Sequence, residues 1–326
     1  MIDLSQFLDF ERPVVEVEEQ LKMLKAQVEG GDLSRAGDVE KLQDKLDKMR
    51  KEVYSSLTAY QRVRLSRHFS RPFTLDYVQR IMANFVELHG DRLFGDDAAI
   101  VGGLARLDRD NVMVVGHQRG RTTAERIKRN FGMPQPEGYR KAQRLFKLAE
   151  KFKLPLILFI DTQGAYPGME AEERGQSEAI ASSLLLLASL KCPIISIVIG
   201  EGGSGGALAL GICDRLLMLE NSTYSVITPE GCASILWGKS DADNIGEFAS
   251  IAAESLGLTA QAVFKTGIVD EIVKEPAGGA HRDHDRAAEL LKESLARHIY
   301  ELKSLSCEEL LRLRYEKFRK CGDFLD

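Results

Sequence analysis

The chain has 326 residues, of which 44% are hydrophobic and 29% are charged, and its net charge is −5. This composition is typical of one large or two ordinary globular domains and excludes disordered and collagen-like chains. The slightly acidic balance speaks against a nucleic-acid-binding protein. Residues 106–153, however, hold 13 basic and 5 acidic residues, a net charge of +8. This segment either meets phosphates or an acidic partner, or forms a solvated face.

The chain shows no sign of a secretory leader or a membrane span. Residues 1–13 are acidic and hold no long apolar run. The most apolar stretch, 180–200, is interrupted by Lys191 and Pro193, so it predicts a buried helix followed by a buried strand. The five cysteines include no C-x-x-C pair, which favours free thiols in a reducing cytoplasm.

The first ninety residues are predicted to be helical and hold no cluster of catalytic side chains. One helix near 14–28 ends at Gly30 and Gly31, and apolar residues recur every three or four positions along 39–53. These two helices are expected to form a hairpin. A third helix, capped by Thr74, is expected to turn five apolar side chains inward: Leu75, Val78, Ile81, Met82 and Phe85.

The central part alternates apolar strands with helices, which is typical of parallel βαβ units. Buried strands are predicted at 112–115, 156–160, 194–199 and 216–219. Helices are predicted around 139–149 and 176–191 and from Gly206 onward. Beyond residue 276 the chain returns to helices, and Ser306 with Glu309 has the spacing of a capping box before the last one.

Two glycine-bearing loops, 161–168 and 200–207, follow two neighbouring predicted strands. The carboxyl ends of parallel strands are where sheets of this class bind ligands. Glycine lets a backbone approach a ligand closely, and a helix that starts near Gly206 adds free N–H groups. The loops therefore predict an anion or oxyanion site made of main-chain amides. The alternative is that the glycines only allow tight packing of a helix on a strand.

The second loop also matches the nucleophile elbow of serine hydrolases. The pattern is Gly202-x-Ser204-x-Gly206, between a strand and a helix as that motif requires. A triad would need an acid and a histidine downstream, and four residues are available for these roles: Asp270, His281, His284 and His298.

The same loop matches a dinucleotide-binding fingerprint, Gly200-x-Gly202-x-x-Gly205, with Glu220 twenty residues further on. That fingerprint would indicate an NAD-dependent oxidoreductase. It normally belongs to the first βα unit of its domain, whereas here at least one βα unit precedes it. Both short patterns are alternatives to the amide site.

No metal site is predicted from spacing. His89, His117, His281 and His284 lack the intervals of metal ligands, and the cysteines lack the spacing of a zinc ribbon. The chain alone is therefore expected to carry no zinc.

Several long segments are more specific than these patterns. They include RIKRNFGMP at 126–134, GAYPG at 164–168, EGGSGGA at 201–207 and GGAH at 278–281. Together they resemble the carboxyltransferase alpha subunits of the multi-subunit acetyl-CoA carboxylases of bacteria and plastids, over nearly the whole chain. The resemblance implies an α/β core of the ClpP/crotonase-like class at 91–275. An N-terminal helical region at 1–90 and C-terminal helices at 276–326 would flank that core.

The resemblance also implies an activity. Members of this family move carboxylate from carboxybiotin, carried on a separate biotin carboxyl carrier protein, to acetyl-CoA and form malonyl-CoA, the first committed step of fatty acid synthesis. The implied partners are a beta subunit in an α2β2 assembly, the carrier protein and an ATP-using biotin carboxylase. Neither a membrane nor a nucleic acid is expected.

By the same resemblance, main-chain amides hold the biotin ureido oxygen. Those of Gly205 and Gly206 are expected on one side, with Gly164 and Ala165 opposite. The other expected substrate-binding residues are Gly202, Gly203, Ser204, Ala207 and Tyr166. A group of cations either steers phosphates or the carrier, or is only solvated: Arg119, Arg121, Arg126, Lys128 and Arg129.

Overall fold

The computed structural model describes residues 7–238 and 245–322, so the first six residues of the acidic start lie outside it. Its centre is an eight-stranded mixed sheet in the order β1-β2-β3-β4-β5-β6-β8, with β7 paired to β5. The β1–β2 and β2–β3 pairs are antiparallel, and the others are parallel. The strands are β1 (Ala83–Glu87), β2 (Ile100–Leu107), β3 (Asp110–His117), β4 (Leu156–Thr162), β5 (Ile194–Gly203), β6 (Arg215–Leu219), β7 (Thr223–Ser225) and β8 (Glu271–Val273).

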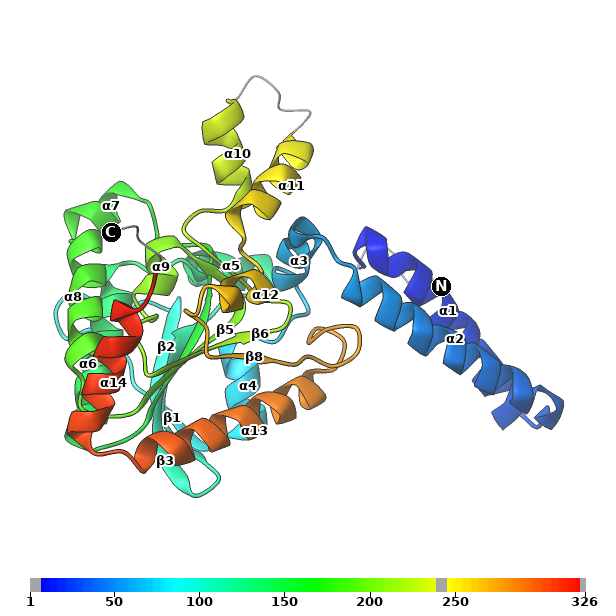
Figure 1. Ribbon diagram of the computed structural model, residues 1–326, viewed down its shortest axis with the longest axis horizontal. Coiled ribbons are helices and arrows are strands. Elements are labelled where there is room, and N and C mark those ends of the chain that lie inside the picture. Colours follow the sequence, from blue (N-terminus) through cyan, green and yellow to red (C-terminus); the bar gives the residue numbers. More distant parts are fainter. Residues whose placement is uncertain (1–6, 239–244, 323–326) are drawn as a thin grey trace.

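Both faces of the sheet are covered by helices, because side chains alternate between the faces of each strand. In β4, Ile157 and Phe159 join one apolar cluster, and Leu156 and Leu158 join the other. The first cluster packs against α4 (Thr74–Ile81) and α13 (His284–Lys303). The second packs against α6 (Pro136–Lys151) and α8 (Gln176–Ser189), with α14 (Cys307–Arg319) beside α8 (Figure 1).

The N-terminal helices form a hairpin that projects from the sheet (Figure 1). They are α1 (Arg12–Glu29) and α2 (Ala36–Ser55), which confirms the predicted pair. Val14, Val17 and Leu21 pack against Leu46 in a small separate core. Three short helices adjoin these two along the chain: η2 (Asp9–Glu11) precedes α1, η3 (Leu33–Arg35) lies between α1 and α2, and α3 (Ala59–Ser66) follows α2.

A second projection consists of α10 (Pro229–Trp237) and α11 (Ile245–Leu256), which lie side by side at the edge of the sheet (Figure 1). Neither helix was predicted as part of a paired arm. The remaining helices are short: α5 (Thr123–Lys128), η4 (Asn130–Gly132), α7 (Met169–Glu173), α9 (Ser204–Leu208) and α12 (Ala260–Lys265).

The four strands predicted from apolar runs are confirmed as β3, β4, β5 and β6. The third N-terminal helix was predicted too long: α4 ends at Ile81, and Phe85 lies in β1. No apolar run marks β1, because it is an edge strand with residues largely outside the core. The sheet therefore begins within the region expected to be wholly helical. Within residues 7–238 and 245–322, no helix has both the length and the apolar character needed to cross a membrane.

Candidate functional site

The two glycine loops lie next to each other, as predicted. β4 and β5 are parallel neighbours, and Thr162 at the end of β4 pairs with Gly202 at the end of β5. The chain after β4 enters the loop 163–168, and the chain after β5 enters α9 directly. The adjacency follows from the topology, because parallel neighbours place their carboxyl ends at the same edge of the sheet.

Three of the glycines are required because neighbouring backbone or side-chain atoms leave no room for a Cβ atom. A Cβ atom on Gly203 would collide with the carbonyl oxygen of Gln163. One on Gly206 would lie 2.6 Å from the carbonyl carbon of Gly164, and one on Gly202 would lie 2.6 Å from the ring of Tyr224. Gly205 differs, because its Cβ would be 3.4 Å from Ile180, an ordinary contact. The packing explanation therefore accounts for Gly202, Gly203 and Gly206 but leaves Gly205 unexplained.

The loops open onto a pocket of about 430 Å³. Five of the predicted site residues line it: Gly164, Ala165, Tyr166, Ser204 and Gly205. The other four are buried beneath it: Gly202, Gly203, Gly206 and Ala207. The rest of the wall includes apolar side chains from outside the loops, among them Met133, Ile180, Val226 and Ile227. The pocket thus combines exposed backbone with an apolar surround.

The hydrogen bonds in the loops distinguish the available donors. The N–H of Gly164 donates to Thr162 Oγ1 at 3.1 Å, and that of Tyr166 donates to the Pro134 carbonyl at 2.9 Å. Among the described residues, the amides of Ala165, Ser204 and Gly205 donate to no loop or turn acceptor, and Ser204 and Gly205 open α9, where the first N–H groups have no partner within the helix. Ala165, Ser204 and Gly205 are therefore among the wall residues whose main-chain donors remain for a ligand.

Gln176, at the start of α8, fixes the first loop. Its buried Nε2 donates to the carbonyls of Pro134 and Tyr166, both at 2.9 Å. It also lines the pocket. This role was not predictable from the sequence, because a glutamine in the first turn of a helix has no recognisable pattern.

A buried charge cluster supports the second loop from below. Asp161 Oδ1 accepts from the N–H of Glu201 at 3.0 Å and is 3.2 Å from the guanidinium of Arg119. The carboxylate of Glu201 pairs with Arg119 and with Arg67, at 3.2 and 2.6 Å. Burial raises the pKa of Asp161, and Arg119 counters this. The cluster holds the ends of β4 and β5 in register through side chains, beneath the backbone that faces the pocket.

The five cations expected either to steer phosphates or to be only solvated lie in different surroundings, although Arg119 and Arg126 line one pocket. Arg119 belongs to the buried cluster, and Arg121 pairs with Asp76. Arg129 donates to the carbonyl of Ala98 at 2.8 Å. Arg126 and Lys128, on α5, are the exposed members without an ion pair among the described residues.

His117, at the end of β3, is a core residue. It is fully buried, and burial lowers its pKa to about 3, so its imidazole is neutral. Its Nδ1 lies 3.4 Å from the N–H of Asp161.

The serine hydrolase alternative lacks a triad. Ser204 is exposed and has a positive φ of 52°, as an elbow serine does. Its four possible partners are engaged elsewhere: His281 with Glu11, His284 with the Ser70 carbonyl, His298 with Glu271, and Asp270 with Lys317. None of them contacts Ser204 within the described residues.

The dinucleotide alternative also lacks support. Glu220, which would have to bind a ribose, pairs with Lys274 at 2.8 Å and accepts from the N–H of Glu275. Gly202 and Gly205 are explained by packing and by the pocket described above.

Comparison with known proteins gives a consistent result. A family model described as acetyl co-enzyme A carboxylase carboxyltransferase-like matches residues 7–322. An acetyl-coenzyme A carboxylase carboxyl transferase subunit alpha of Geobacter metallireducens is 56% identical over 323 residues, which is 99% of this chain and 99% of that protein. The corresponding subunit of Pseudoalteromonas atlantica is 55% identical over 318 residues, 97% and 98% of the two chains.

Among solved structures, the transcarboxylase 12S chain superposes with a TM-score of 0.58 over 72% of this chain, at 19% identity. The beta subunit of Pseudomonas aeruginosa geranyl-CoA carboxylase superposes with a TM-score of 0.54 over 78% of this chain, at 18% identity. The chain spans 42% and 46% of those two proteins. These similarities show a shared crotonase-like fold.

Proposed function

Because the chain belongs to the acetyl-CoA carboxylase carboxyltransferase alpha-subunit family, we propose that its glycine-loop pocket holds biotin while carboxylate passes to acetyl-CoA. The observation that carries the proposal is the pair of unpartnered amides, on Ala165 and Gly205, in one pocket. Biotin would arrive on a separate carrier protein and leave after transfer, so it is a substrate group rather than a resident cofactor.

Carboxyl transfer from biotin needs hydrogen-bond donors to the ureido oxygen more than it needs a side-chain base. Carboxybiotin supplies a carboxylate whose N–C bond breaks as a C–C bond to the acetyl methyl carbon forms, and the methyl proton ends on the biotin nitrogen. Negative charge then develops on the ureido oxygen. Preorganised N–H groups that meet this charge lower the barrier, by about 3–4 kcal/mol per donor in comparable sites.

The residues of this chain fit that group. Ala165 and Gly205 would direct their N–H groups at the ureido oxygen, and Met133, Ile180 and Val226 offer apolar contact for the fused rings. Gly206 and Gly164 would act by letting the two loops approach, since a Cβ on Gly206 would strike the backbone of Gly164. Gln176 and the Asp161–Glu201 cluster would keep both donors in place.

The partner subunit would cover a second, more apolar pocket of about 570 Å³. This pocket shares Ser204, Gly205 and Val226 with the first, and Val226 is 78% exposed. Further exposed apolar side chains lie on the α10 part of the arm: Ile235, Leu236 and Trp237. A beta subunit seated here would bring acetyl-CoA to the biotin, in an α2β2 assembly that also works with the carrier protein and biotin carboxylase. The unpaired cysteines support a cytoplasmic setting.

Malonyl-CoA formation by the reconstituted alpha and beta subunits, with carboxylated carrier, tests this assignment. Gly205→Val fills the pocket without a backbone collision, so the subunit should fold normally yet lower kcat by about 100-fold or more. Gly37→Val is the matched control, because Gly37 lies on the hairpin with open space around it and should leave kcat unchanged. A Gly205→Val subunit that assembles and turns over normally would remove this pocket from the reaction.

A further inference from the structure

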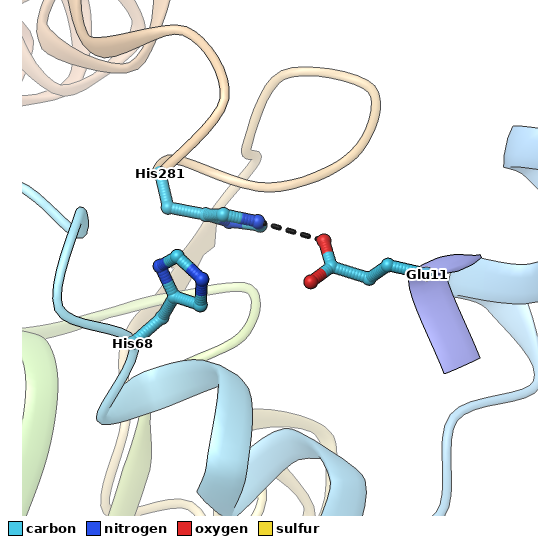
Figure 2. A group of neighbouring side chains, drawn as sticks. All are labelled: Glu11, His68 and His281. Carbon is cyan, nitrogen blue, oxygen red and sulfur yellow. Dashed lines mark hydrogen bonds and ion pairs between the residues drawn. The ribbon is translucent and has the colours of Figure 1, made fainter. Parts of the chain in front are cut away.

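Three side chains from distant parts of the chain meet in one buried place (Figure 2). Glu11 ends η2, His68 lies between α3 and α4, and His281 lies in the loop before α13. One ligand atom from each lies within 4.8 Å of the other two. Their exposures are 1%, 8% and 7%, so the group is shielded from solvent.

The carboxylate of Glu11 is held in a fixed orientation. The Tyr54 hydroxyl donates to Oε1 at 2.5 Å, and the N–H of Leu8 donates to Oε2 at 2.9 Å. His281 Nε2 lies 2.8 Å from Oε1. Outer hydrogen bonds of this kind orient the ligands of metal sites and are half of their construction.

The imidazoles of His68 and His281 lie against each other, with ring centroids 4.3 Å apart and ring planes inclined by 48°. Figure 2 shows both rings turned toward the carboxylate of Glu11. Among residues 7–238 and 245–322, the buried Nδ1 of His281 has no hydrogen-bond partner, so the group leaves part of its polar capacity unused.

We propose that Glu11, His68 and His281 form a binding site for a divalent transition metal of the zinc class. Two histidines and one carboxylate are a recurrent zinc ligand set, with water in the fourth position. Bonds of about 2.0–2.1 Å place neighbouring ligand atoms about 3.3 Å apart. His281 Nε2 lies 2.8 Å from Glu11 Oε1, and all three ligand atoms lie within 4.8 Å of one another, so the side chains must shift to receive the metal.

One cost of loading is the loss of the 2.8 Å hydrogen bond between His281 Nε2 and Glu11 Oε1. A second cost concerns His68. His68 Nδ1 accepts from the N–H of Ser70 at 3.2 Å, and a metal on Nε2 would place the ring proton on Nδ1. The ring must then turn away from Ser70. With three protein ligands and these costs, the site binds more weakly than a four-ligand structural zinc site.

The metal would act as a clamp. It joins the start of the N-terminal hairpin to two loops of the core. The ion pair between Arg71 and Glu275 ties the same two loops together. None of the three ligands lines the 430 Å³ pocket, so this proposal stands apart from the carboxyltransferase assignment. It also differs from the prediction of no metal site, because that prediction considered only the spacing of residues along the sequence.

The test uses the full-length chain after chelator treatment, with Cys232, Cys307 and Cys321 replaced by serine to remove accessible thiols. Titration with zinc chloride, followed by desalting and elemental analysis, should give one zinc per chain. Cobalt chloride should give a visible spectrum of nitrogen and oxygen ligation. Hydrogen exchange of amides in η2 and α1 should slow at least severalfold on zinc addition.

Glu11→Gln keeps the shape and the acceptor oxygen of the side chain, and it should weaken zinc binding at least tenfold. His68→Gln is a second variant with the same expected loss, used if Glu11→Gln does not fold by circular dichroism. His89→Gln is the matched control: His89 is an exposed histidine beside Asp96 and Glu87, and its loss should leave binding unchanged. Absence of stoichiometric zinc in the parent chain would overturn the proposal, and so would equal binding by the parent and either ligand variant.

Discussion

The glycine-loop pocket and the Glu11–His68–His281 junction are built in opposite ways. The pocket is made by two consecutive βα units, and its walls are mostly backbone held close by glycines. The junction is made by side chains 270 positions apart in sequence, and charged and polar contacts hold it together. The comparison teaches that one chain can specify a reactive surface by local backbone fit and an anchoring contact by long-range charge pairing.

The two constructions should fail differently. A backbone site tolerates changes in charge around it but not an added Cβ atom. A side-chain junction tolerates added volume at its surface but not the loss of one member of a buried pair. The variants of the glycine loops and of the buried ion pair each test one of these two kinds of site.

Gly206→Val should have the largest effect. Its Cβ would lie 2.6 Å from the Gly164 backbone, so the loops must separate and both unpartnered amides must move. We expect kcat to fall by about 1,000-fold, the upper end for loss of one oxyanion donor, together with a lower unfolding midpoint. Gly37→Val on α2 has open space and should change neither quantity. Normal turnover by Gly206→Val would show that close approach of the loops is not needed.

Arg71→Met should be the most damaging change beside the junction, because the Arg71–Glu275 ion pair ties together the two loops that carry His68 and His281. Arg71 and Glu275 are fully buried and bonded twice, at 2.6 and 3.0 Å. Removing the guanidinium leaves a buried carboxylate unpaired, which costs about 3–5 kcal/mol of unfolding free energy. Urea unfolding measures this loss.

Arg80→Met is the matched control for that experiment. Arg80 pairs with Asp285 at 2.7 Å on the surface, where the two side chains are 31% and 84% exposed. Such a pair contributes about 0–1 kcal/mol. Equal losses from the two variants would contradict the idea that buried charge pairing anchors the junction.

Acid should weaken the contact between these two loops through the Arg71–Glu275 pair. Burial favours the neutral form of Glu275, but Arg71 and backbone donors outweigh it and lower the pKa from 4.5 to about 2. Because the pKa of Glu275 is lower in the folded chain than in the unfolded chain, its ionised carboxylate stabilises the fold above pH 4.5. This stabilisation is lost as the pH falls toward 2. The stability gap between the parent chain and Glu275→Gln should therefore be full at pH 7 and shrink below pH 4.5. A gap that stays constant between pH 7 and 3 would exclude this linkage.

The same contrast explains what the sequence revealed. Strands β4 and β5 and their loops were predictable, because continuous apolar runs followed by glycines are local patterns. The support beneath them was not: Gln176, Glu201 and Arg67 act through contacts that only the folded sheet creates. The junction was missed because spacing rules search for ligands near each other in the chain, whereas residues 11, 68 and 281 come together only in three dimensions. The ion pairs of Arg119 were not predictable for a related reason, since its partners Asp161 and Glu201 lie on β4 and β5.

The smallest expected effect comes from the exposed cations on α5, which belong to neither construction. Arg126 and Lys128 follow the carboxyl end of β3, the sheet edge that carries the glycine loops. If they attract phosphates or an acidic carrier, Arg126→Glu with Lys128→Glu should raise KM about threefold to tenfold at low salt and leave kcat unchanged. Arg109→Glu with Lys153→Glu changes the charge equally, but those residues precede the amino ends of β3 and β4, at the opposite edge. Salt above 0.1 M shortens the Debye length below about 10 Å, so it should erase the difference between the two double variants. Equal KM values for the two double variants at low salt would show that α5 is only a solvated face and does not attract phosphates or the carrier.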